Sequence, residues 1–392
     1  MKEKRTAVLI SCFGWYEQRL ELIRDVLKEE YNVLVLMADF DHIKKSAVET
    51  QIPECIYLHV PPYKKNISLK RIKSHLCFGS LVKRYIEETS PSLLYLIVPP
   101  NHIARHCLQY KQAHKDCKYL IDIVDLWPES MPFGNIKKFL RFSGWKDMRN
   151  DSLKVADHIF VECDLYRKKL DKVMDKRRST VLHLYKRLSS DEHKLVVSLL
   201  EETKRTCLKN KRKLALGYVG SINHIVDHHK ICGFIEGLVC AGWEVALHVI
   251  GDGEERENFL AGARRAGGQC IYYGKVFDFA EKANILCRCD YGLNIMKDSV
   301  EVGLTTKSLE YFSMGIPLIN NIRGDTWDIV EEYGAGINYR DLSYVLSEIQ
   351  NEGDELRDNA LKCYSELFTP DVFRKKFCEA MEQVESGGKR LV

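Results

Sequence analysis

The sequence lacks the long apolar runs and proline-rich stretches that mark membrane-spanning or disordered chains. No run of about 20 apolar residues occurs, so no spanning helix is expected. Only 10 prolines are present and no segment is of low complexity, which leaves little room for disorder. The apolar run near the N-terminus, TAVLISCFG, is short and soon followed by charge. We therefore expect a first core strand there and not a signal peptide.

Cysteine pairs at the spacing of metal or redox motifs are also missing. No CxxC occurs among the 14 cysteines, and Cys287 and Cys289 form only a CxC without a second pair at zinc spacing. The cysteines are scattered, mostly within apolar runs such as those around Cys12, Cys107 and Cys240. We expect buried free thiols in a reducing compartment.

Charge is unevenly distributed along the chain. Residues 1–190 hold 34 Lys+Arg and 23 Asp+Glu, a net charge of +11, whereas residues 191–392 hold 25 and 32, a net charge of −7. A basic half suits an anionic membrane, an anionic substrate or nucleic acid. Because no recognisable nucleic-acid-binding module is present, we expect no nucleic-acid partner.

Short β-rich runs alternate with helical stretches through both halves, which predicts parallel sheets covered by helices on both faces. In the first half the expected strands are 6–12, 32–38, 92–98, 118–124, 158–163 and 180–185, and the expected helices are 16–30, 67–88, 102–115, 136–155 and 164–174. In the second half the expected strands are 213–220, 244–251, 269–274, 289–295, 316–321 and 335–339.

A chain of 392 residues is too long for one ordinary core and suits two α/β domains. We predict a Rossmann-like domain over 1–190, a charged linker over 191–212, a second Rossmann-like domain over 213–368, and a C-terminal helix over 369–392 that packs back towards the first domain. Because ligands of open α/β sheets bind beyond the carboxyl ends of the strands, we expect a ligand cleft between the domains.

Two glycine turns follow strands of the second half. In YVGSI, Gly220 lets the backbone approach a phosphate and Ser221 offers a hydroxyl. In IGDGEER, Gly251 and Gly253 give half of a dinucleotide fingerprint, without its third glycine. Either turn alone is also compatible with a plain strand-to-helix connection.

The segment EVGLTTKSLEYFSMGIPLINN (301–321) carries the strongest indication of a site. Thr305 and Thr306 are candidate N-caps of a helix whose free N–H groups would meet a diphosphate. Lys307 lies in the first turn, where it can neutralise phosphate charge, and a carboxylate at Glu310 can accept both hydroxyls of a ribose. The alternative is a surface helix on which Lys307 and Glu310 pair with each other.

The order YVGSI, IGDGEER, YYGKVFD, CDYGLNI and GLTTKSLEYFSMGIPLINN resembles the donor domain of GT-B glycosyltransferases of family 4. The likeness covers most of 210–340, and DLWPES (125–130) resembles a motif of the N-terminal domain in that group. The sequence looks most like the bacterial enzymes that assemble capsule, exopolysaccharide or O-antigen repeat units.

The resemblance implies a role for each matching residue. Glu310 would hold the donor ribose, the base would lie against Val276 and Phe277, and Lys307 would lie beside the diphosphate. The full set expected to bind the donor is Gly220, Ser221, Gly251, Val276, Phe277, Gly303, Leu304, Thr305, Thr306, Lys307 and Glu310.

The sequence also departs from the family pattern. The family often shows Glu-x7-Glu, in which the first glutamate reaches the sugar, but Val302 stands at that position and Glu301 is one residue away. The arginine that often follows YVG is replaced by Ser221, and Lys230 is a candidate for the accompanying lysine. What contacts the sugar in place of the first glutamate is left open.

The N-terminal half is expected to bind the acceptor. Asp125, the first residue of DLWP, ends a strand and is our candidate acid–base group, although an aspartate before a turn can equally be a cap. His102 follows another strand, and we count it with Asp125 and Lys307 as catalytic candidates. Acceptor contacts are expected from Gly14, Trp15, Glu17, Asp122 and Trp127.

Two basic stretches with interleaved apolar residues, 63–85 and 135–149, suit either contact with an anionic membrane surface or helices with solvated basic faces. Asp39 and Asp41 form a DxD, which binds a metal-nucleotide in the other large glycosyltransferase fold, but here they end a strand away from the donor signals. We therefore expect no cofactor and no essential metal.

On the basis of this resemblance, we predict that the protein is a hexosyltransferase that retains the anomeric configuration and needs no metal ion. It would move a sugar from a nucleotide-sugar, by base rate a UDP-sugar, to a saccharide or a polyprenyl-diphosphate-linked saccharide. We expect it in the cytoplasm, with peripheral contact to the inner face of the cell membrane as an option. Domain closure and charge stabilisation by Lys307 would assist departure of the diphosphate.

Three other interpretations stay open. An inverting GT-B enzyme would use Asp125 or His102 as its base, and a sugar-nucleotide epimerase would need carboxylates at the donor. A non-catalytic glycosyltransferase-like partner subunit is favoured by the missing first glutamate.

Overall fold

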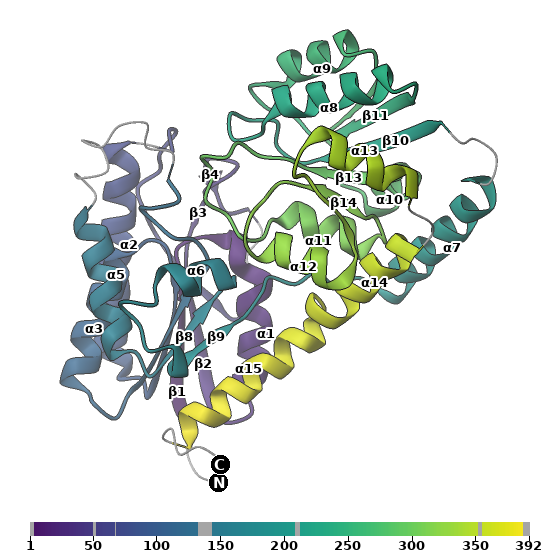
Figure 1. Cartoon of the computed structure of the whole chain (residues 1–392). Helices are drawn as coiled ribbons and strands as arrows, with labels where there is room; N and C mark the ends of the chain where they lie inside the picture. The colour runs from purple at the N-terminus through teal and green to yellow at the C-terminus, as the bar shows by residue number, and fades with distance from the viewer. Residues whose placement is uncertain are drawn as a thin grey trace. The chain divides into compact units, whose positions relative to one another are not determined.

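The computed structural model describes residues 4–49, 52–66, 68–131, 143–207, 212–351 and 355–386. It divides into two compact units: unit 1 comprises Met1–Leu184 and Phe373–Val392, and unit 2 comprises Tyr185–Val372. Figure 1 shows the course of the chain through both.

Unit 1 is built on a sheet of seven parallel strands in the order β5-β2-β1-β6-β7-β8-β9. The strands are β1 (Arg5–Ser11), β2 (Tyr31–Ala38), β5 (Cys55–Leu58), β6 (Leu93–Val98), β7 (Lys118–Ile123), β8 (His158–Val161) and β9 (Ser179–Val181). A small antiparallel pair, β3 (Phe40–Asp41) and β4 (Ser46–Ala47), lies outside it. The three short elements β3, β4 and β5 were absent from the sequence prediction, because too few residues alternate there.

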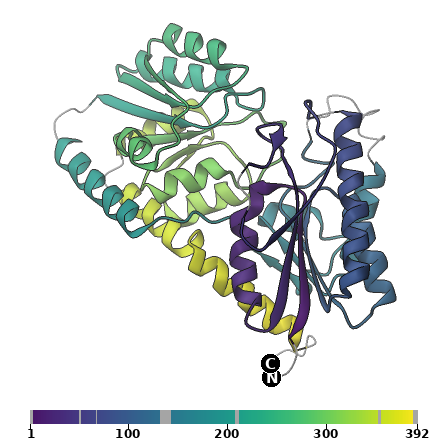
Figure 2. The ribbon, with the colours of Figure 1, turned by 180° about the vertical axis from the view of Figure 1, so that it is seen from behind.

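Helices cover both faces of the unit 1 sheet. On one face lie α2 (Leu69–Thr89), α3 (His102–Ala113) and α5 (Ser143–Val155). On the other lie α1 (Glu17–Leu27) and most of α15 (Pro370–Glu385) (Figure 2), while α6 (Asp164–Lys169) contacts β8 and β9. Every residue of β6 is buried, as expected for a central parallel strand covered on both sides. The short 3-10 helices η1 (Gly14–Tyr16) and η2 (Lys176–Arg178) complete the unit.

Unit 2 carries a sheet of six parallel strands in the order β12-β11-β10-β13-β14-β15. The strands are β10 (Lys213–Val219), β11 (Glu244–Ile250), β12 (Gln269–Gly274), β13 (Tyr291–Asn294), β14 (Leu318–Asn320) and β15 (Gly336–Asn338). The helices on one face are α8 (His228–Cys240), α9 (Arg256–Arg265) and α13 (Leu342–Asn351). The helices on the other are α10 (Phe279–Leu286), α11 (Thr306–Ser313) and α12 (Asp325–Tyr333), backed by α7 (Ser190–Cys207) and α14 (Glu355–Leu367).

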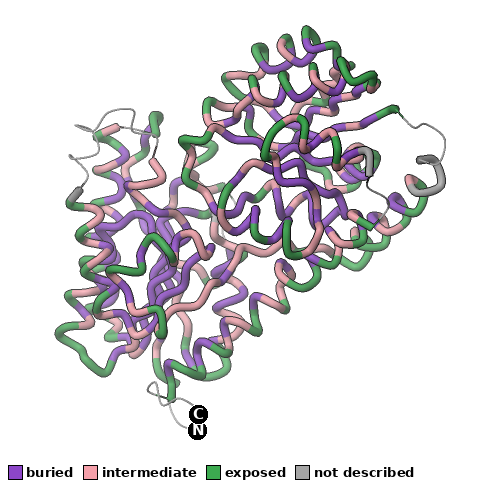
Figure 3. Tube along the Cα trace, viewed as in Figure 1, coloured by how far each residue is buried: buried purple, intermediate pink, exposed green. Residues whose placement is uncertain are grey.

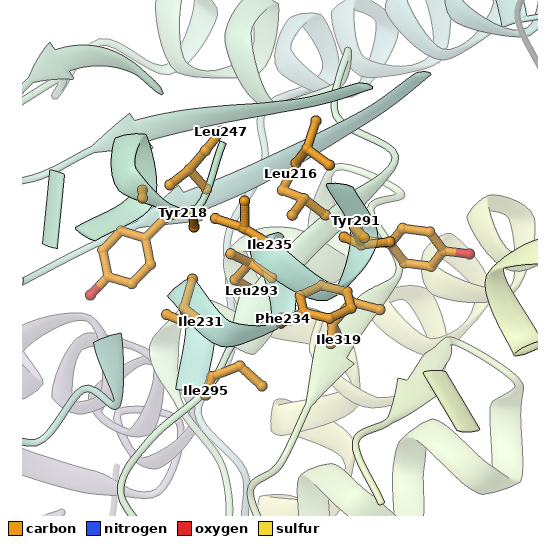
Figure 4. Packing of buried hydrophobic residues seen from close by; sticks show 14 of the residues in the cluster. Leu216, Tyr218, Ile231, Phe234, Ile235, Leu247, Tyr291, Leu293, Ile295 and Ile319 are labelled. Atoms are coloured by element: carbon orange, nitrogen blue, oxygen red, sulfur yellow. The ribbon is translucent and has the colours of Figure 1, made fainter. Parts of the chain in front are cut away.

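The core of unit 2 joins the sheet to its helices. Leu216, Leu247 and Leu293 from three strands meet Phe234 and Ile235 of α8 (Figure 4). Each such buried side chain stabilises the fold by about 1.5–3 kcal/mol relative to its exposed state. In Figure 3 the strands of each sheet are drawn mostly in the buried colour.

The charged segment after residue 186 differs from the expected linker over 191–212. Most of it forms α7, which belongs to unit 2 and contacts α10. Val196, Leu199 and Leu200 are buried on its inner side. Because these three apolar residues recur at helical spacing, α7 has an apolar stripe that unit 2 covers.

Candidate functional site

The two glycine turns at the carboxyl edge of the unit 2 sheet pack against each other. Gly220 and Gly251 both have positive φ angles, of 117° and 139°. A Cβ atom on Gly251 would lie 1.9 Å from the carbonyl oxygen of Gly220, and the amide of Gly220 donates to Ile250 O at 2.9 Å. Only glycine allows this approach of one turn to the other, so Gly251 supports the shape of the Gly220 turn.

Lys307 lies directly against the Gly220 turn. A Cβ atom on Gly220 would lie 3.0 Å from Lys307 Cε. The Lys307 ammonium donates to the Tyr218 hydroxyl at 2.9 Å and lies 4.3 Å from the centroid of that ring. The Tyr218 hydroxyl donates in turn to Ser221 O at 2.6 Å, while Ser221 itself is exposed.

No carboxylate among the described residues lies within ion-pairing distance of Lys307. Although the residue as a whole keeps some exposure, burial of its ammonium group lowers the pKa of Lys307 to about 7. An unpaired lysine of this kind is prepared to accept an anion, because an anion would restore its normal charged state.

Lys307 is held in the first turn of α11, whose N-terminus is built as predicted. Thr305 is the N-cap, and its hydroxyl accepts from the amide of Ser308 at 3.1 Å. The amides of Thr306 and Lys307 make no hydrogen bond to any part of the chain that the structure describes. Free amides at a helix N-terminus attract anions, and here they accompany the unpaired lysine.

The loop before α11 is fixed to α12. The carbonyl oxygen of Gly303 accepts from both the amide and the hydroxyl of Thr326, each at 2.8 Å. Gly303 and Leu304 are buried, whereas Thr306 is exposed.

A row of three buried asparagines is hydrogen-bonded to Thr305. Asn294, Asn320 and Asn338 end β13, β14 and β15 in register. Asn294 Nδ2 donates to Asn320 Oδ1 at 3.0 Å, and Asn320 Nδ2 to Asn338 Oδ1 at 2.8 Å. The Thr305 hydroxyl donates to Asn294 Oδ1 at 3.1 Å. We call these three residues the asparagine row. Sequence reasoning missed it, although each of three strands visibly ends in Asn.

Glu310 lies one turn along α11 and is held by two lysines. Lys186 and Lys282 each donate to one of its oxygens at 2.7 Å, and all three side chains are largely covered. Burial acts to raise the pKa of Glu310, but the two lysines more than offset it, so the pKa is lowered. Glu310 does not pair with Lys307, which removes the surface-helix alternative. Lys186 and Lys282 were not among the predicted site residues.

The segment after β12 presents the residues predicted to hold the base. Val276 is buried, but the Phe277 side chain is 86% exposed. Lys230 of α8 pairs with the exposed Asp298 at 3.2 Å. The predicted donor residues therefore gather along the carboxyl edge of one sheet, with Gly220, Lys307 and the start of α11 in direct contact.

In unit 1, Asp125 follows β7 at the carboxyl edge of its sheet. Its oxygens accept from Trp127 Nε1 at 2.7 Å and from the Ser130 hydroxyl. Burial raises the pKa of Asp125 in spite of these hydrogen bonds. A carboxyl group at this edge of a parallel sheet is placed where a proton acceptor for a bound ligand would stand.

Asp122 has a different environment from the one expected of an acceptor-binding residue. It is 0% exposed, and its two oxygens accept from Arg19 at 2.6 and 2.9 Å. The Tyr95 hydroxyl also donates to it. This arrangement argues against a contact with an acceptor, since alternation along β7 turns the side chain into the core. Asp122 and Arg19 form a buried structural ion pair.

His102 is likewise occupied within the fold. Its Nε2 donates to the carbonyl oxygen of His75 at 2.6 Å, and burial lowers the pKa of His102 to about 4. A Cβ atom on Gly79 would lie 2.7 Å from the same nitrogen, so α2 and α3 are closely packed there. We therefore remove His102 from the candidate bases, because the nitrogen on its packed side is already bonded.

The remaining acceptor candidates lie after β1 and β7. Gly14 is exposed, Glu17 begins α1, and burial raises the pKa of the Glu17 carboxyl. The Trp15 side chain lies outside what the structure describes. Trp127 is half-buried, with its ring 6.2 Å from those of Phe13 and Trp145.

The predicted basic stretches are described only in part. Within 63–85, Leu69 and Leu76 of α2 are 80% and 51% exposed. Within 135–149, residues 135–142 lie outside the described residues, and Trp145 packs on Trp127. No helix in the described ranges has both the length and the apolar character needed to cross a membrane.

Both aspartates of the DxD accept hydrogen bonds from backbone amides of unit 1. Asp39 accepts from the amide of Val60 at 2.9 Å, and Asp41 accepts from the amide of Ile43 at 2.7 Å. Within the described residues, no group of three or more His, Cys, Asp or Glu side chains is placed to hold a metal ion.

A cavity of about 880 Å³ lies at the opposite edge of the unit 2 sheet. Its lining includes Lys213, Ala215, Glu244 and Ala246, at the beginnings of β10 and β11. Because the predicted donor residues all follow the strand ends, this cavity is not part of their site.

Solved structures of glycosyltransferases are similar to this chain over its whole length. A sucrose-phosphate synthase from Thermosynechococcus elongatus is 13% identical, with a TM-score of 0.64 over 98% of this chain and 100% of that one. An α,α-trehalose-phosphate synthase (UDP-forming) from Burkholderia vietnamiensis is 10% identical, with a TM-score of 0.67 over 100% of both chains. The lipopolysaccharide outer core galactosyltransferase WaaB is 13% identical, with a TM-score of 0.63 over 96% and 99%.

No protein-family model matches the chain, and no curated protein matches it by sequence. The structural likeness, at these low identities, establishes the fold. The chain has the GT-B fold of two Rossmann-like domains, and this prediction is confirmed.

Proposed function

We propose that the protein is a glycosyltransferase that takes a sugar from a nucleotide-sugar held by unit 2. The observation that carries the proposal is the unpaired ammonium of Lys307, which lies against the Gly220 turn at the N-terminus of α11. The Gly220 turn has no side-chain bulk, and two free amides and an unpaired lysine lie beside it. Together these groups suit a diphosphate.

The ribose would bind at Glu310. A ribose has two neighbouring hydroxyl donors, and a carboxylate with a lowered pKa stays ionised to accept both. Lys186 and Lys282 hold the carboxylate in place before the ligand arrives. The exposed Phe277 ring lies in the segment proposed for the base.

We propose UDP as the carrier, because a similar structure is described as UDP-forming and another was solved with UDP-2-fluoro-glucose. The charge that develops on the departing diphosphate would be stabilised by Lys307 and the amides of α11, without an essential metal ion. Membership of family 4, retention of configuration and a role in cell-surface polysaccharide synthesis belong to the same proposal, and rest on the motifs of 218–321.

Unit 1 would bind the acceptor, a saccharide or a lipid-linked saccharide. Asp125 and Trp127 lie at the carboxyl edge of its sheet, where ligands of such sheets bind. The position of Asp125 at this edge favours one alternative, an inverting enzyme with Asp125 as the general base. The anomeric configuration of the product, read by NMR, distinguishes the two mechanisms.

The first test is a thermal-shift experiment with UDP, GDP, dTDP, CMP and NAD, with and without Mg²⁺. A ligand at about 100 times its dissociation constant stabilises the folded state by about 2.7 kcal/mol, which is a clear melting shift. We expect UDP to stabilise the wild type without metal, and Lys307→Ala and Glu310→Ala to lose the shift.

Lys213→Ala is the matched control, because Lys213 pairs with Glu244 at the other edge of the same sheet. It should keep the UDP shift. If no nucleoside diphosphate stabilises the wild type, the donor site is disproved and a non-catalytic partner subunit becomes the better hypothesis.

A further inference from the structure

Unit 1 contains a buried cation that forms no ion pair with any carboxylate in the described residues. Arg71, in the first turn of α2, is only 7% exposed. Its Nη1 donates to Asn66 O at 2.8 Å, and its Nε donates to His75 Nε2 at 3.4 Å. No carboxylate in the described ranges of the chain lies within ion-pairing distance of it. An uncompensated buried charge is costly, so its presence calls for a reason.

Aromatic rings surround the guanidinium. Its Cζ lies 4.8 Å from the centroid of the Trp127 ring, 5.7 Å from that of Phe13 and 5.8 Å from that of Tyr63. These rings stabilise a cation but do not neutralise it. Burial lowers the pKa of Arg71, yet a guanidinium stays protonated at neutral pH. The positive charge is therefore permanent.

The aromatic residues around Arg71 lie at the edge of the sheet where parallel sheets bind ligands. Phe13 follows β1, Tyr63 follows β5 and Trp127 follows β7, so all three lie beyond the carboxyl ends of strands. Open parallel sheets bind their ligands at this edge.

The histidines and the cysteine that face Arg71 add no neutralising anion. Burial lowers the pKa of His42 to about 4 and holds the pKa of His75 well below its usual value, so both imidazoles are neutral at pH 7. Burial raises the pKa of the Cys12 thiol to about 12, so it too stays neutral. His75 Nδ1 is buried and has no hydrogen-bond partner in the described chain.

Two charged groups lie near the guanidinium without ion-pairing with it, and Arg71 acts to lower the pKa of both, Asp125 and Lys45. The oxygens of Asp125 accept from Trp127 and Ser130, and do not ion-pair with Arg71. The ammonium of Lys45 lies 5.0 Å from the centroid of the Tyr63 ring, and burial lowers its pKa. A second cation therefore stands beside the same aromatic group.

We propose that Arg71 binds a phosphate group of the acceptor, within a subsite walled by Phe13, Tyr63 and Trp127. A planar guanidinium recognises phosphate through paired hydrogen bonds, and the second cation at Lys45 favours a doubly charged ester over a carboxylate. This inference rests on the proposed function, since it names the class of acceptor. The phosphate belongs either to a soluble sugar phosphate or to a prenyl-diphosphate-linked saccharide.

The test measures binding of glucose 6-phosphate, a short prenyl diphosphate and glucuronate by calorimetry. Because anions can also bind at Lys307, the measurements are made in the full chain carrying Lys307→Ala. We expect one phosphate ester to bind, Arg71→Met to weaken it at least tenfold, and Arg71→Lys to retain part of the affinity. The tighter of the two esters identifies the source of the phosphate.

Separate controls establish that the variants fold and that the donor site is independent. Arg71→Met in the wild-type background should keep the UDP shift, and should melt at the wild-type temperature or above it, because it removes an unpaired buried charge. The proposal is overturned if Arg71→Met leaves phosphate-ester binding unchanged, or if glucuronate binds as tightly. Neither result affects the donor site, whose failure would appear as the loss of UDP binding in the wild type.

Discussion

Lys307 links ligand binding to protonation. The free protein has a lowered pKa at this lysine, about 7, so the group is mostly neutral at pH 8. A bound diphosphate would restore the charged form and raise that pKa. Binding then takes up a proton, and affinity falls as the pH rises above 7, through the range between the free and bound pKa values.

Calorimetry of UDP binding at pH 8, in buffers of different ionisation enthalpy, measures this uptake directly. We expect it to approach about one proton for the wild type, because a single lysine is titrated. Lys307→Arg is the matched control, since a guanidinium is charged at every pH used and should bind without uptake. Equal uptake in both proteins would exclude Lys307 as the group that titrates.

The helix α11 is held at its N-cap by the buried asparagine row. Its cap, Thr305, is bonded to Asn294, which is bonded through Asn320 to Asn338. Buried polar networks of this kind hold a geometry strongly when every member is satisfied. The asparagine row therefore fixes where the free amides of α11 and Lys307 stand.

Breaking the row at its middle should affect stability and binding together. Asn320→Ala leaves the Asn294 and Asn338 amide groups without their shared partner, at a cost of about 1–3 kcal/mol. We expect the variant to unfold at a lower urea concentration, with an unchanged dependence of its unfolding free energy on urea. We also expect weaker UDP binding at temperatures where the variant is folded. Asn284→Ala, on the surface of α10, should change neither. Unaltered UDP affinity in Asn320→Ala would show that the row does not position α11.

At the element scale the sequence predicted strands and helices well, because both sheets are buried on two faces and their strands are nearly continuous apolar runs. The α11 N-terminus was also predictable, since Thr305 as a cap and Lys307 one turn in are local features. The asparagine row was not, because it depends on the register of three strands that are far apart in sequence. Asp122 was misjudged for a related reason. Its partners Arg19 and Tyr95 are far from it in sequence, so the buried ion pair could not be read from the strand's last residues alone.

The molecule as a whole divides its charge between its halves, with net charges of +11 and −7 over 1–190 and 191–392. In unit 1 the excess lies partly along α2, where Leu69 and Leu76 are exposed beside Lys70 and Lys73. Exposed apolar side chains among lysines suit an anionic lipid surface.

Co-sedimentation with phosphatidylglycerol vesicles tests this surface. We expect the wild type to bind at low salt and to dissociate as salt rises, because the attraction of lysines to lipid is screened. Leu69→Ser with Leu76→Ser should reduce binding several-fold, whereas Phe277→Ser, which removes an even more exposed apolar side chain from unit 2, should not. Binding that persists in the double variant would exclude α2 as the contact.

The position of α15 at the end of the chain affects the order in which unit 1 can fold during synthesis. Phe377 of α15 packs on Tyr95 and Phe160 of the unit 1 sheet, and Phe373 lies under the Arg19 guanidinium. The ribosome therefore releases all the strands of unit 1 well before the helix that covers one of their faces. Unit 2, which is continuous in sequence, emerges whole in between. During synthesis, the first unit to begin folding is therefore the last to be finished, since of α1 and α15 only α1 is present on that face until the end of the chain emerges.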